Sequence, residues 1–282
     1  MTAPLRAGAP PVTALYVPGD RPDRFDKAVG TGAEVVILDL EDAVAPAHKA
    51  RARDAVVGWL TAHADEGRSA FQVRVNAGDR DDLAAVASLP RGVQVRLPKV
   101  EGPGDVDAAA RACPGRGVVA IVETARGLRE ATATAQHRAV SGVVLGEADL
   151  LSDLGAASAA LVDHARFALL VAARAAGLPA PMLSAYPRIR DLDGLRADTE
   201  RGRALGWFGR TAVHPSQLAV IREVFAPTED ELAWADEVLS AVVGGGVATL
   251  GDGQMVDPAM IGRARAIRDR ASSGPGSPPA GS

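Results

Sequence analysis

Acidic side chains stand at or shortly after the ends of short aliphatic runs in this chain, and Asp39, Glu123 and Asp149 are the clearest cases. Magnesium takes oxygen ligands, usually one or two protein carboxylates completed by substrate and water oxygens. If Glu123 and Asp149 end neighbouring strands, the pair predicts a magnesium site. From spacing alone, each could equally be an exposed loop acid or a helix N-cap.

Arg74 interrupts another aliphatic run, close in sequence to a group of three acids, Asp39, Glu41 and Asp42. A buried guanidinium needs a partner, and its planar fork suits a substrate carboxylate. A structural ion pair with Glu41 or Asp42 explains the same pattern, and both readings stay open.

The three acids repel one another unless cations intervene, so they are candidates for orienting metal-bound water or transferring a proton.

Several other chemistries have no support in the sequence. There is no GxGxxG or GxxxxGK[ST] loop for a nucleotide and no GxSxG elbow around a nucleophilic serine. The five histidines are scattered and Cys113 is the single cysteine, which argues against zinc and excludes an intrachain disulfide.

The elements that must position these side chains alternate between strand and helix. Eight candidate strands cover residues 14–18, 35–40, 71–76, 93–98, 118–123, 142–146, 181–185 and 209–214. Candidate helices cover residues 48–63, 105–112, 127–136, 157–176 and 192–205, with two more at 228–242 and 258–271. Eight strand–helix units predict an α/β fold, a (β/α)8 TIM barrel, in which the carboxyl ends of the strands meet on the face that carries active sites.

Length and composition agree with this fold class. The chain has 282 residues, of which 47% are hydrophobic and only 4% aromatic, so the core must be aliphatic. We expect a flexible N-terminal arm (1–12), the barrel (13–226), a C-terminal helical extension (227–271) and a disordered tail (272–282).

Charge and hydropathy limit the partners. The net charge is −4 and the basic residues are dispersed, which gives nucleic-acid binding no support. No run of about 18 residues is apolar enough to span a bilayer, and the first eleven residues do not form a signal peptide. We therefore expect a cytoplasmic protein with no membrane partner.

Seven segments resemble, in the same order, the motifs of the citrate lyase beta-subunit-like family, part of the HpcH/HpaI aldolase/citrate lyase superfamily. They are YVPGDRPDRF (16–25), VILDLEDAV (36–44), VRVN (73–76), LPKVE (97–101), IVETARG (121–127), DLLSDLG (149–155) and VHPSQ (213–217). The resemblance runs from about Ala14 to Arg270. It departs from the family pattern at Glu147-Ala148-Asp149, where many relatives have the acid directly before the aspartate, at residues 182–186, and at Arg210, where a lysine is common.

The resemblance implies a (β/α)8 barrel, usually a homotrimer, with Mg²⁺ as cofactor. It implies that Glu123 and Asp149 bind the metal, that Arg74 and Glu123 contact the substrate, and that Asp39 and Glu41 are catalytic acids around the metal. The segment GQMVD (253–257) resembles one that carries an aspartate into a neighbouring subunit's site. Asp257 is therefore a candidate acid/base, although it also suits an N-cap for a helix starting at Pro258.

The activity implied is that of a carbon–carbon lyase or synthase acting on a 3-hydroxyacyl-CoA thioester of the malyl, citramalyl, hydroxymethylglutaryl or citryl type, through a thioester enolate. Its partners would be an acyl-CoA and a small carboxylic or keto acid. Two alternatives stay open: a magnesium-dependent aldolase on free 2-keto acids, and a non-catalytic ligand-binding barrel.

Overall fold

The structure, a computed structural model, describes residues 10–242, 249–251 and 253–272, and its centre is a parallel sheet. The strands are β1 (Thr13–Pro18), β2 (Val35–Asp39), β3 (Ala70–Arg74), β4 (Gln94–Leu97), β5 (Val118–Val122), β6 (Val140–Leu145) and β7 (Arg210–Ala212). Their order is β6-β5-β4-β3-β2-β1-β7, and every neighbouring pair is parallel. The predicted α/β fold is thus confirmed.

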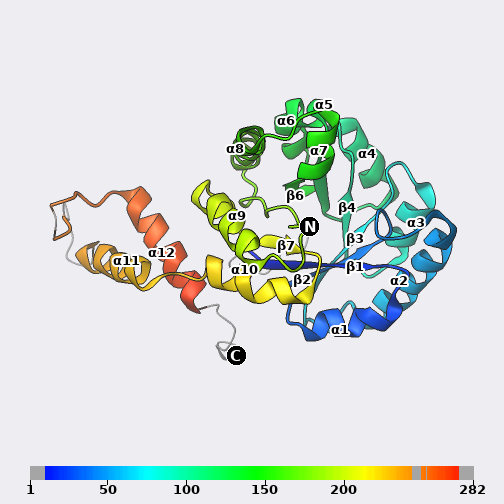
Figure 1. Cartoon of the computed structure of the whole chain (residues 1–282), viewed down its shortest axis with the longest axis horizontal. Helices are drawn as coiled ribbons and strands as arrows, with labels where there is room; N and C mark the ends of the chain where they lie inside the picture. The colour runs from blue at the N-terminus through cyan, green and yellow to red at the C-terminus, as the bar shows by residue number, and fades with distance from the viewer. Residues whose placement is uncertain (1–9, 243–248, 252, 273–282) are drawn as a thin grey trace. The chain divides into compact units, whose positions relative to one another are not determined.

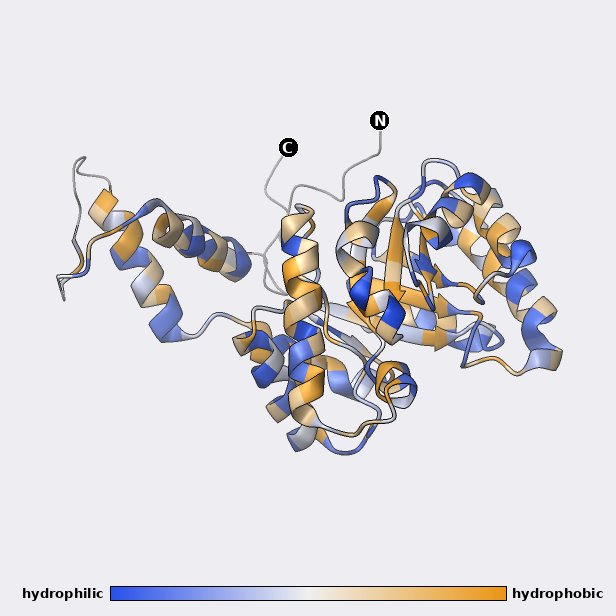
Figure 2. Ribbon diagram, turned by 90° about the horizontal axis from the view of Figure 1, so that it is seen from above, coloured by the Kyte–Doolittle hydropathy of each residue, from blue (hydrophilic) through white to orange (hydrophobic). Residues whose placement is uncertain are grey.

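The strands form where β-branched and aliphatic residues run together. All five residues of β2 and of β5 are buried, as expected for strands covered on both faces. Figure 2 shows the strands as the hydrophobic centre of this part of the chain. The register aligns Asp39 with Arg74 and Arg74 with Arg96, so the polar ends of β2, β3 and β4 lie side by side.

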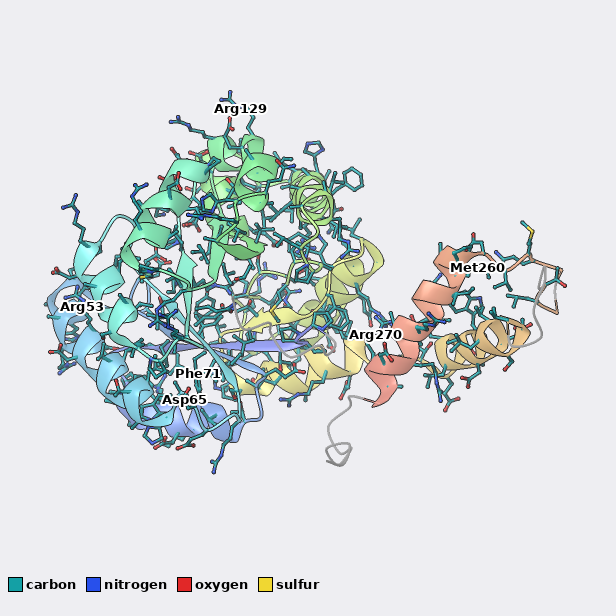
Figure 3. The ribbon with its side chains drawn as sticks, turned by 180° about the vertical axis from the view of Figure 1, so that it is seen from behind. Arg53, Asp65, Phe71, Arg129, Met260 and Arg270 are labelled. Atoms are coloured by element: carbon teal, nitrogen blue, oxygen red, sulfur yellow. The ribbon has the colours of Figure 1, made fainter. Side chains whose placement is uncertain are left out.

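Helices lie around the outside of the curled sheet (Figure 1). They are α1 (Phe25–Gly30), α2 (Lys49–His63), α3 (Arg80–Ser88), α4 (Pro103–Ala112), α5 (Ala125–Arg129), α6 (Ala131–Ala135), α7 (Glu147–Asp153), α8 (Ala159–Ala175), α9 (Leu192–Ala204) and α10 (Leu218–Phe225). Side chains fix several of their ends: Asp79, Thr124 and Asp191 accept backbone N–H groups at the starts of α3, α5 and α9. Arg53 of α2, labelled in Figure 3, donates to the buried Asp82 of α3 at 2.8 Å and ties the two helices together.

The segment expected as a strand at residues 181–185 makes a single parallel bridge, Leu183 with Arg210, rather than a full strand. Proline at position 181 has no N–H to give to a ladder, which limits pairing there. On the other side of this segment, Ser184 Oγ donates to the carbonyl of Leu145 at the end of β6. Among the described residues, no backbone ladder joins β6 to this segment.

The described residues from Phe225 onward belong to a second compact unit. Its helices α11 (Glu229–Val242) and α12 (Pro258–Ser272) pack through a small core that includes Ala235, Val238 and Ile267. Most of the predicted N-terminal arm (1–9) and of the predicted tail (273–282) lies outside the described residues. In the part of the chain that the structure describes, no helix is long and apolar enough to cross a membrane.

Candidate active site

The carboxyl ends of β2, β3 and β5, with the first turn of α7, carry five of the six residues singled out from the sequence. These are Asp39, Glu41, Arg74, Glu123 and Asp149. They belong to one electrostatic group, since the charges of Arg74 and Asp149 act on the carboxyl of Glu123, and those of Arg74 and Glu123 act on that of Glu41. The sixth, Asp257, belongs to the C-terminal unit.

Arg74 is held by Asp39 through two parallel hydrogen bonds. Arg74 Nε donates to Asp39 Oδ1 at 2.7 Å and Nη2 donates to Oδ2 at 2.6 Å. Asp39 is 1% exposed and also accepts the backbone N–H groups of Glu41 and Ala43. Both oxygens of Asp39 are thus engaged, and the carboxylate fixes the plane of the guanidinium.

The remaining side of the guanidinium meets the other two acids. Arg74 Nη1 lies 2.8 Å from Glu41 Oε2 and 3.0 Å from Asp42 Oδ2, and its face stacks on the ring of Tyr16 at 4.8 Å. Asp42 is mostly exposed whereas Glu41 is buried. The structural ion pair that the sequence left open therefore exists, and Asp42 is the partner most accessible to exchange.

Burial raises the pKa of Glu41 to about 7, because Arg74 only partly offsets the loss of solvation and the charges of Asp42, Glu123 and Asp39 add repulsion. A carboxyl group that titrates near neutral pH can both take up and release a proton under working conditions. Glu41 is therefore the acid of this group best suited to proton transfer.

This pKa predicts a pH-dependent stability difference for Glu41→Gln. Because the pKa of Glu41 in the folded state lies above the ordinary 4.5, its protonated carboxyl group stabilises the fold. This stabilisation is fully present below about pH 4.5 and is lost as the pH rises through about 7. In chelator, we expect the permanently neutral variant to gain about 1–3 kcal/mol of unfolding free energy relative to the native chain between pH 5 and pH 8. Urea unfolding at the two pH values measures it. Glu66→Gln, at a partly exposed carboxylate, is the control. If the difference in unfolding free energy between Glu41→Gln and the native chain is the same at pH 5 and pH 8, the prediction is wrong.

Glu123 directly follows β5 and is 6% exposed. Its Oε1 accepts the backbone N–H of Lys99 at 2.7 Å. Burial raises the pKa of Glu123; the Lys99 hydrogen bond opposes the rise, and the nearby charge of Asp149 adds to it. A buried carboxylate with a second carboxylate close by is a point of excess negative charge.

Lys99 joins the two proposed metal ligands. Its backbone takes the left-handed conformation, with φ of +54°, so that its N–H meets Glu123 while its Nζ donates to Asp149 Oδ2 at 3.2 Å. Asp149 lies in the first turn of α7, four residues after β6, rather than at the strand end itself. Its side chain is about half exposed.

Gly146, at the junction of β6 and α7, packs directly on Glu123. A Cβ at this position would stand 2.4 Å from Glu123 Oε2 and 2.5 Å from its Cβ. We expect Gly146→Ala to displace Glu123 and to cost about 1–3 kcal/mol of unfolding free energy. Gly142→Ala, within β6, is the matched control, because its Cβ would meet only Val119 Cγ2 at 4.0 Å. Equal unfolding midpoints in urea for the two variants would contradict this role.

The donor set suits a hard divalent cation. Glu123 and Asp149 offer carboxylate oxygens where negative charge is in excess, which is the environment that magnesium prefers. In the described ranges, no group of three or more His, Cys, Asp or Glu side chains surrounds one point. A pair of carboxylates completed by substrate and water oxygens is a usual magnesium complement.

Asp257 is an N-cap in this structure. Its Oδ1 accepts the backbone N–H of Met260 at 2.8 Å, and Pro258 opens α12 directly after it. This is the structural role that the sequence analysis allowed. The side chain is exposed.

Three contributors to the site were not singled out from the sequence. Tyr16 stacks on Arg74 and accepts a hydrogen bond from Arg96 at 3.0 Å, Lys99 joins the two acids, and Gly146 makes room for Glu123. Lys99 follows β4 by two residues, as the acids follow their strands, so its position was a usable signal, whereas Tyr16 lies inside β1. The left-handed backbone of Lys99 has no signal in a residue that is not glycine.

The sequence and the structure of this chain are both similar to those of known proteins. The family model for HpcH/HpaI aldolase/citrate lyase matches residues 13–215. A (3S)-malyl-CoA thioesterase of Cereibacter sphaeroides is 38% identical over 90% of this chain and 92% of its own length. An L-malyl-CoA/beta-methylmalyl-CoA lyase of Rhodobacter capsulatus is 32% identical over the same shares. The crystal structure of protein CitE from Mycobacterium tuberculosis, in complex with magnesium, acetoacetate and coenzyme A, is 37% identical and covers 95% of this chain and 100% of its own, with a TM-score of 0.80.

Proposed function

The chain belongs to the HpcH/HpaI aldolase/citrate lyase family, and on that premise we propose that it is a magnesium-dependent carbon–carbon lyase or synthase that acts on a 3-hydroxyacyl-CoA thioester. The observation that carries the proposal is that Glu123 is buried, with a raised pKa, and that Asp149 adds a second negative charge close to it. Arg74, held by Asp39, belongs to the same group of charges, and Lys99 contacts Asp149. This arrangement offers a place for a cation next to a place for a substrate carboxylate.

Glu123 and Asp149 would hold the magnesium ion. A bound ion supplies a Lewis acid for the hydroxyl or keto oxygen of the small-acid half of the substrate. The chain's contribution is to keep both carboxylates in place, through the Lys99 N–H on Glu123 and the helical turn around Asp149.

Arg74 would bind the carboxylate of the small-acid half. Asp39 holds the guanidinium plane through Nε and Nη2, so Nη1 is the edge offered to a ligand. The exposed Asp42 is the group that a substrate carboxylate would replace there. Asp39 is then the residue that orients Arg74.

Glu41 would carry the proton. In cleavage, its carboxylate removes the hydroxyl proton, the carbon–carbon bond breaks, and the resulting thioester enolate is protonated on carbon; in synthesis the steps reverse. Asp257 is a second candidate acid, delivered from a neighbouring subunit if the protein is a homotrimer.

The full architecture belongs to the same proposal. We propose that residues 13–226 close into a (β/α)8 barrel, with residues 181–185 as its seventh strand between β6 and β7, and that residues 227–271 are the helical extension. The Leu183–Arg210 bridge and the Ser184–Leu145 hydrogen bond support this closure.

The test is a lyase assay with malyl, citramalyl, hydroxymethylglutaryl and citryl thioesters, with and without magnesium. We expect the release of an acyl-CoA and a free keto acid from at least one of them, only when magnesium is present. Turnover of free 2-keto acids without any thioester would favour an aldolase instead. Ligand binding without turnover of any substrate would favour a non-catalytic barrel.

Hydrolysis of malyl-CoA is a second candidate, favoured by the 38% identity to a malyl-CoA thioesterase. The products separate the two reactions, since cleavage of malyl-CoA yields glyoxylate and acetyl-CoA whereas hydrolysis yields malate and CoA. A free thiol without any keto acid would assign the hydrolase.

A further inference from the structure

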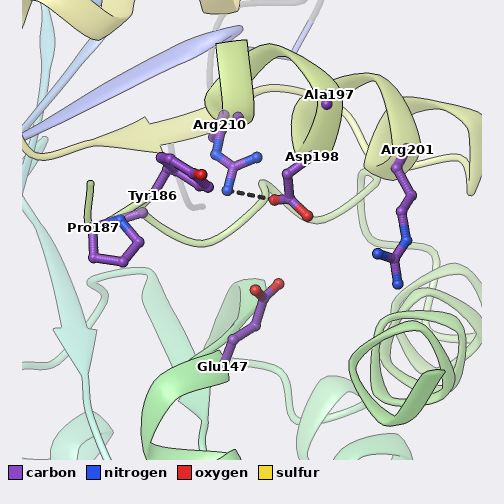
Figure 4. Close-up of a pocket in the computed structure, with 9 residues that line it drawn as sticks. Glu147, Tyr186, Pro187, Ala197, Asp198, Arg201 and Arg210 are labelled. Carbon is purple, nitrogen blue, oxygen red and sulfur yellow. Dashed lines mark ion pairs between the residues drawn. The ribbon is translucent and has the colours of Figure 1, made fainter. Parts of the chain in front are cut away.

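Four charged side chains form a largely buried group beside the proposed metal site, which we call the four-charge cluster. Its members are Glu147 of α7, Arg166 of α8, Asp198 of α9 and Arg210 of β7. Arg166 is 0% exposed and Arg210 is 1% exposed. Figure 4 shows the carboxylates of Glu147 and Asp198 directed into the same space, with Arg210 turned toward Asp198.

Arg166 is the centre of this cluster. Arg166 donates two hydrogen bonds to the carboxylate of Glu147, from Nε to Oε1 at 2.7 Å and from Nη2 to Oε2 at 3.1 Å. Its Nη2 also lies 3.0 Å from Asp198 Oδ2. Arg210 Nη2 meets the same Asp198 oxygen at 2.7 Å. Two positive and two negative charges balance, so the loss of any single one leaves an uncompensated buried charge.

The cluster touches the proposed metal site through one helical turn. Glu147 is the first residue of α7, and Asp149 stands two residues later in the same turn. On the inner side, Gly146 packs against Glu123 and donates its N–H to the carbonyl of Val122 at 2.9 Å. On the side away from Glu123, Arg166 donates two hydrogen bonds to the carboxylate of Glu147 in this turn.

Two kinds of contact hold the first turn of α7. Leu150 is 1% exposed and anchors the turn in the hydrophobic core. On the side of Glu147, a cavity of about 430 Å³ is lined also by Tyr186, Asp198 and Arg210. There the two hydrogen bonds from Arg166 hold the Glu147 carboxylate.

We infer that Arg166 is a positioning residue for Asp149: through Glu147 it fixes the first turn of α7, and so the placement of one proposed magnesium ligand relative to the other. This inference rests on the proposed function, because it takes Glu123 and Asp149 as the metal site. Arg166 touches neither the metal nor the substrate in this role. Partners that orient metal ligands commonly change metal affinity by 10–100-fold when they are removed.

The experiment compares Arg166→Gln, Glu147→Gln and the double variant by calorimetric titration with Mg²⁺, together with thermal unfolding. Each single variant leaves an unbalanced charge, so we expect a lower Tm and a magnesium affinity weakened about tenfold. The double variant leaves Asp198 and Arg210 as a balanced pair, so its Tm should rise above those of the single variants. Its magnesium affinity should stay weak, because the two hydrogen bonds from Arg166 to Glu147 are gone.

Two controls separate the outcomes. Arg201→Gln breaks an ion pair between α9 and α8, with Arg201 Nε to Asp163 Oδ1 at 2.9 Å, and should leave magnesium affinity unchanged. If the double variant binds Mg²⁺ as tightly as the native chain while Asp149→Asn does not, the positioning role is overturned and the proposed metal site stands. If Asp149→Asn also binds Mg²⁺ like the native chain, the proposed metal site itself is wrong.

Discussion

Replacing Glu123 by Gln or Asp149 by Asn is expected to lower kcat/KM by about a thousandfold or more while the fold survives. Each change removes one charge and one strong oxygen donor from the proposed metal site without changing the size of the side chain. A Lewis-acid metal contributes several kcal/mol to the stabilisation of charge in the transition state, and about 4 kcal/mol corresponds to a thousandfold in rate. The lyase assay at saturating magnesium measures the effect, and circular dichroism tests the fold.

The contacts of these two residues explain why the fold should tolerate the changes. A glutamine at position 123 can still accept the Lys99 N–H through its amide oxygen, and it removes a charge that burial disfavours. Asp149 is about half exposed, and its ion pair with Lys99 contributes little to stability at such a position.

Asp81→Asn is the matched control for this prediction, because Asp81 also lies in the first turn of a helix and is exposed. Its activity should match that of the native chain. Native activity in both site variants, or activity that persists in excess chelator, would show that the pair does not hold a metal required for the reaction.

The strands were predictable because their physical signal is local. Seven of the eight candidate ranges fall within two residues of an observed strand at each end, since a short β-branched run is enough to form a buried parallel strand. The range 209–214 shortened to three residues, and 181–185 shortened to one bridge beside Pro181. The expected helix at 127–136 divides into α5 and α6 at Glu130, which lies outside the helical region with ψ of +5°.

That the side chains of the site lie near one another was predictable from the sequence, but the contacts they make were not. Strand-end position was enough to bring Asp39, Arg74 and Glu123 together, because parallel strands end at one edge. It left open whether Arg74 pairs with a substrate carboxylate or with Glu41 or Asp42, and it did not single out Asp39, which makes two hydrogen bonds with the guanidinium.

The location of Asp149 also lay beyond the sequence pattern. It was expected at a strand end, and it stands in α7, a helix of seven residues that the aliphatic pattern does not mark. Glu147 at the start of that helix pairs with Arg166 of α8, which in turn pairs with Asp198 of α9, and both partners come later in the chain. Such contacts between distant segments have no local signal.

Arg74→Lys is expected to lower kcat/KM by about a hundredfold or more and to raise the KM for the small-acid half. Lysine keeps the positive charge but is a point charge, so it cannot make the two parallel bonds to Asp39 or stack a planar group on Tyr16. The cation would no longer be fixed where a substrate carboxylate arrives, and a displacement of about 1 Å in a catalytic site costs about a hundredfold. Steady-state kinetics in the direction of synthesis, with the keto acid varied, gives both constants.

A second substitution separates the substrate role of Arg74 from its structural one. Arg74→Met also removes the charge and leaves Asp39, which is 1% exposed, without its partner, so we expect a further loss of about 3–5 kcal/mol of unfolding free energy. Arg53→Lys is the control, because Arg53 is likewise paired with a buried aspartate, Asp82, yet does not belong to the proposed site. It should keep native kcat/KM. If Arg74→Lys also keeps native kcat/KM and only Arg74→Met is impaired, Arg74 serves to neutralise Asp39 and Glu41, and the substrate carboxylate must bind elsewhere.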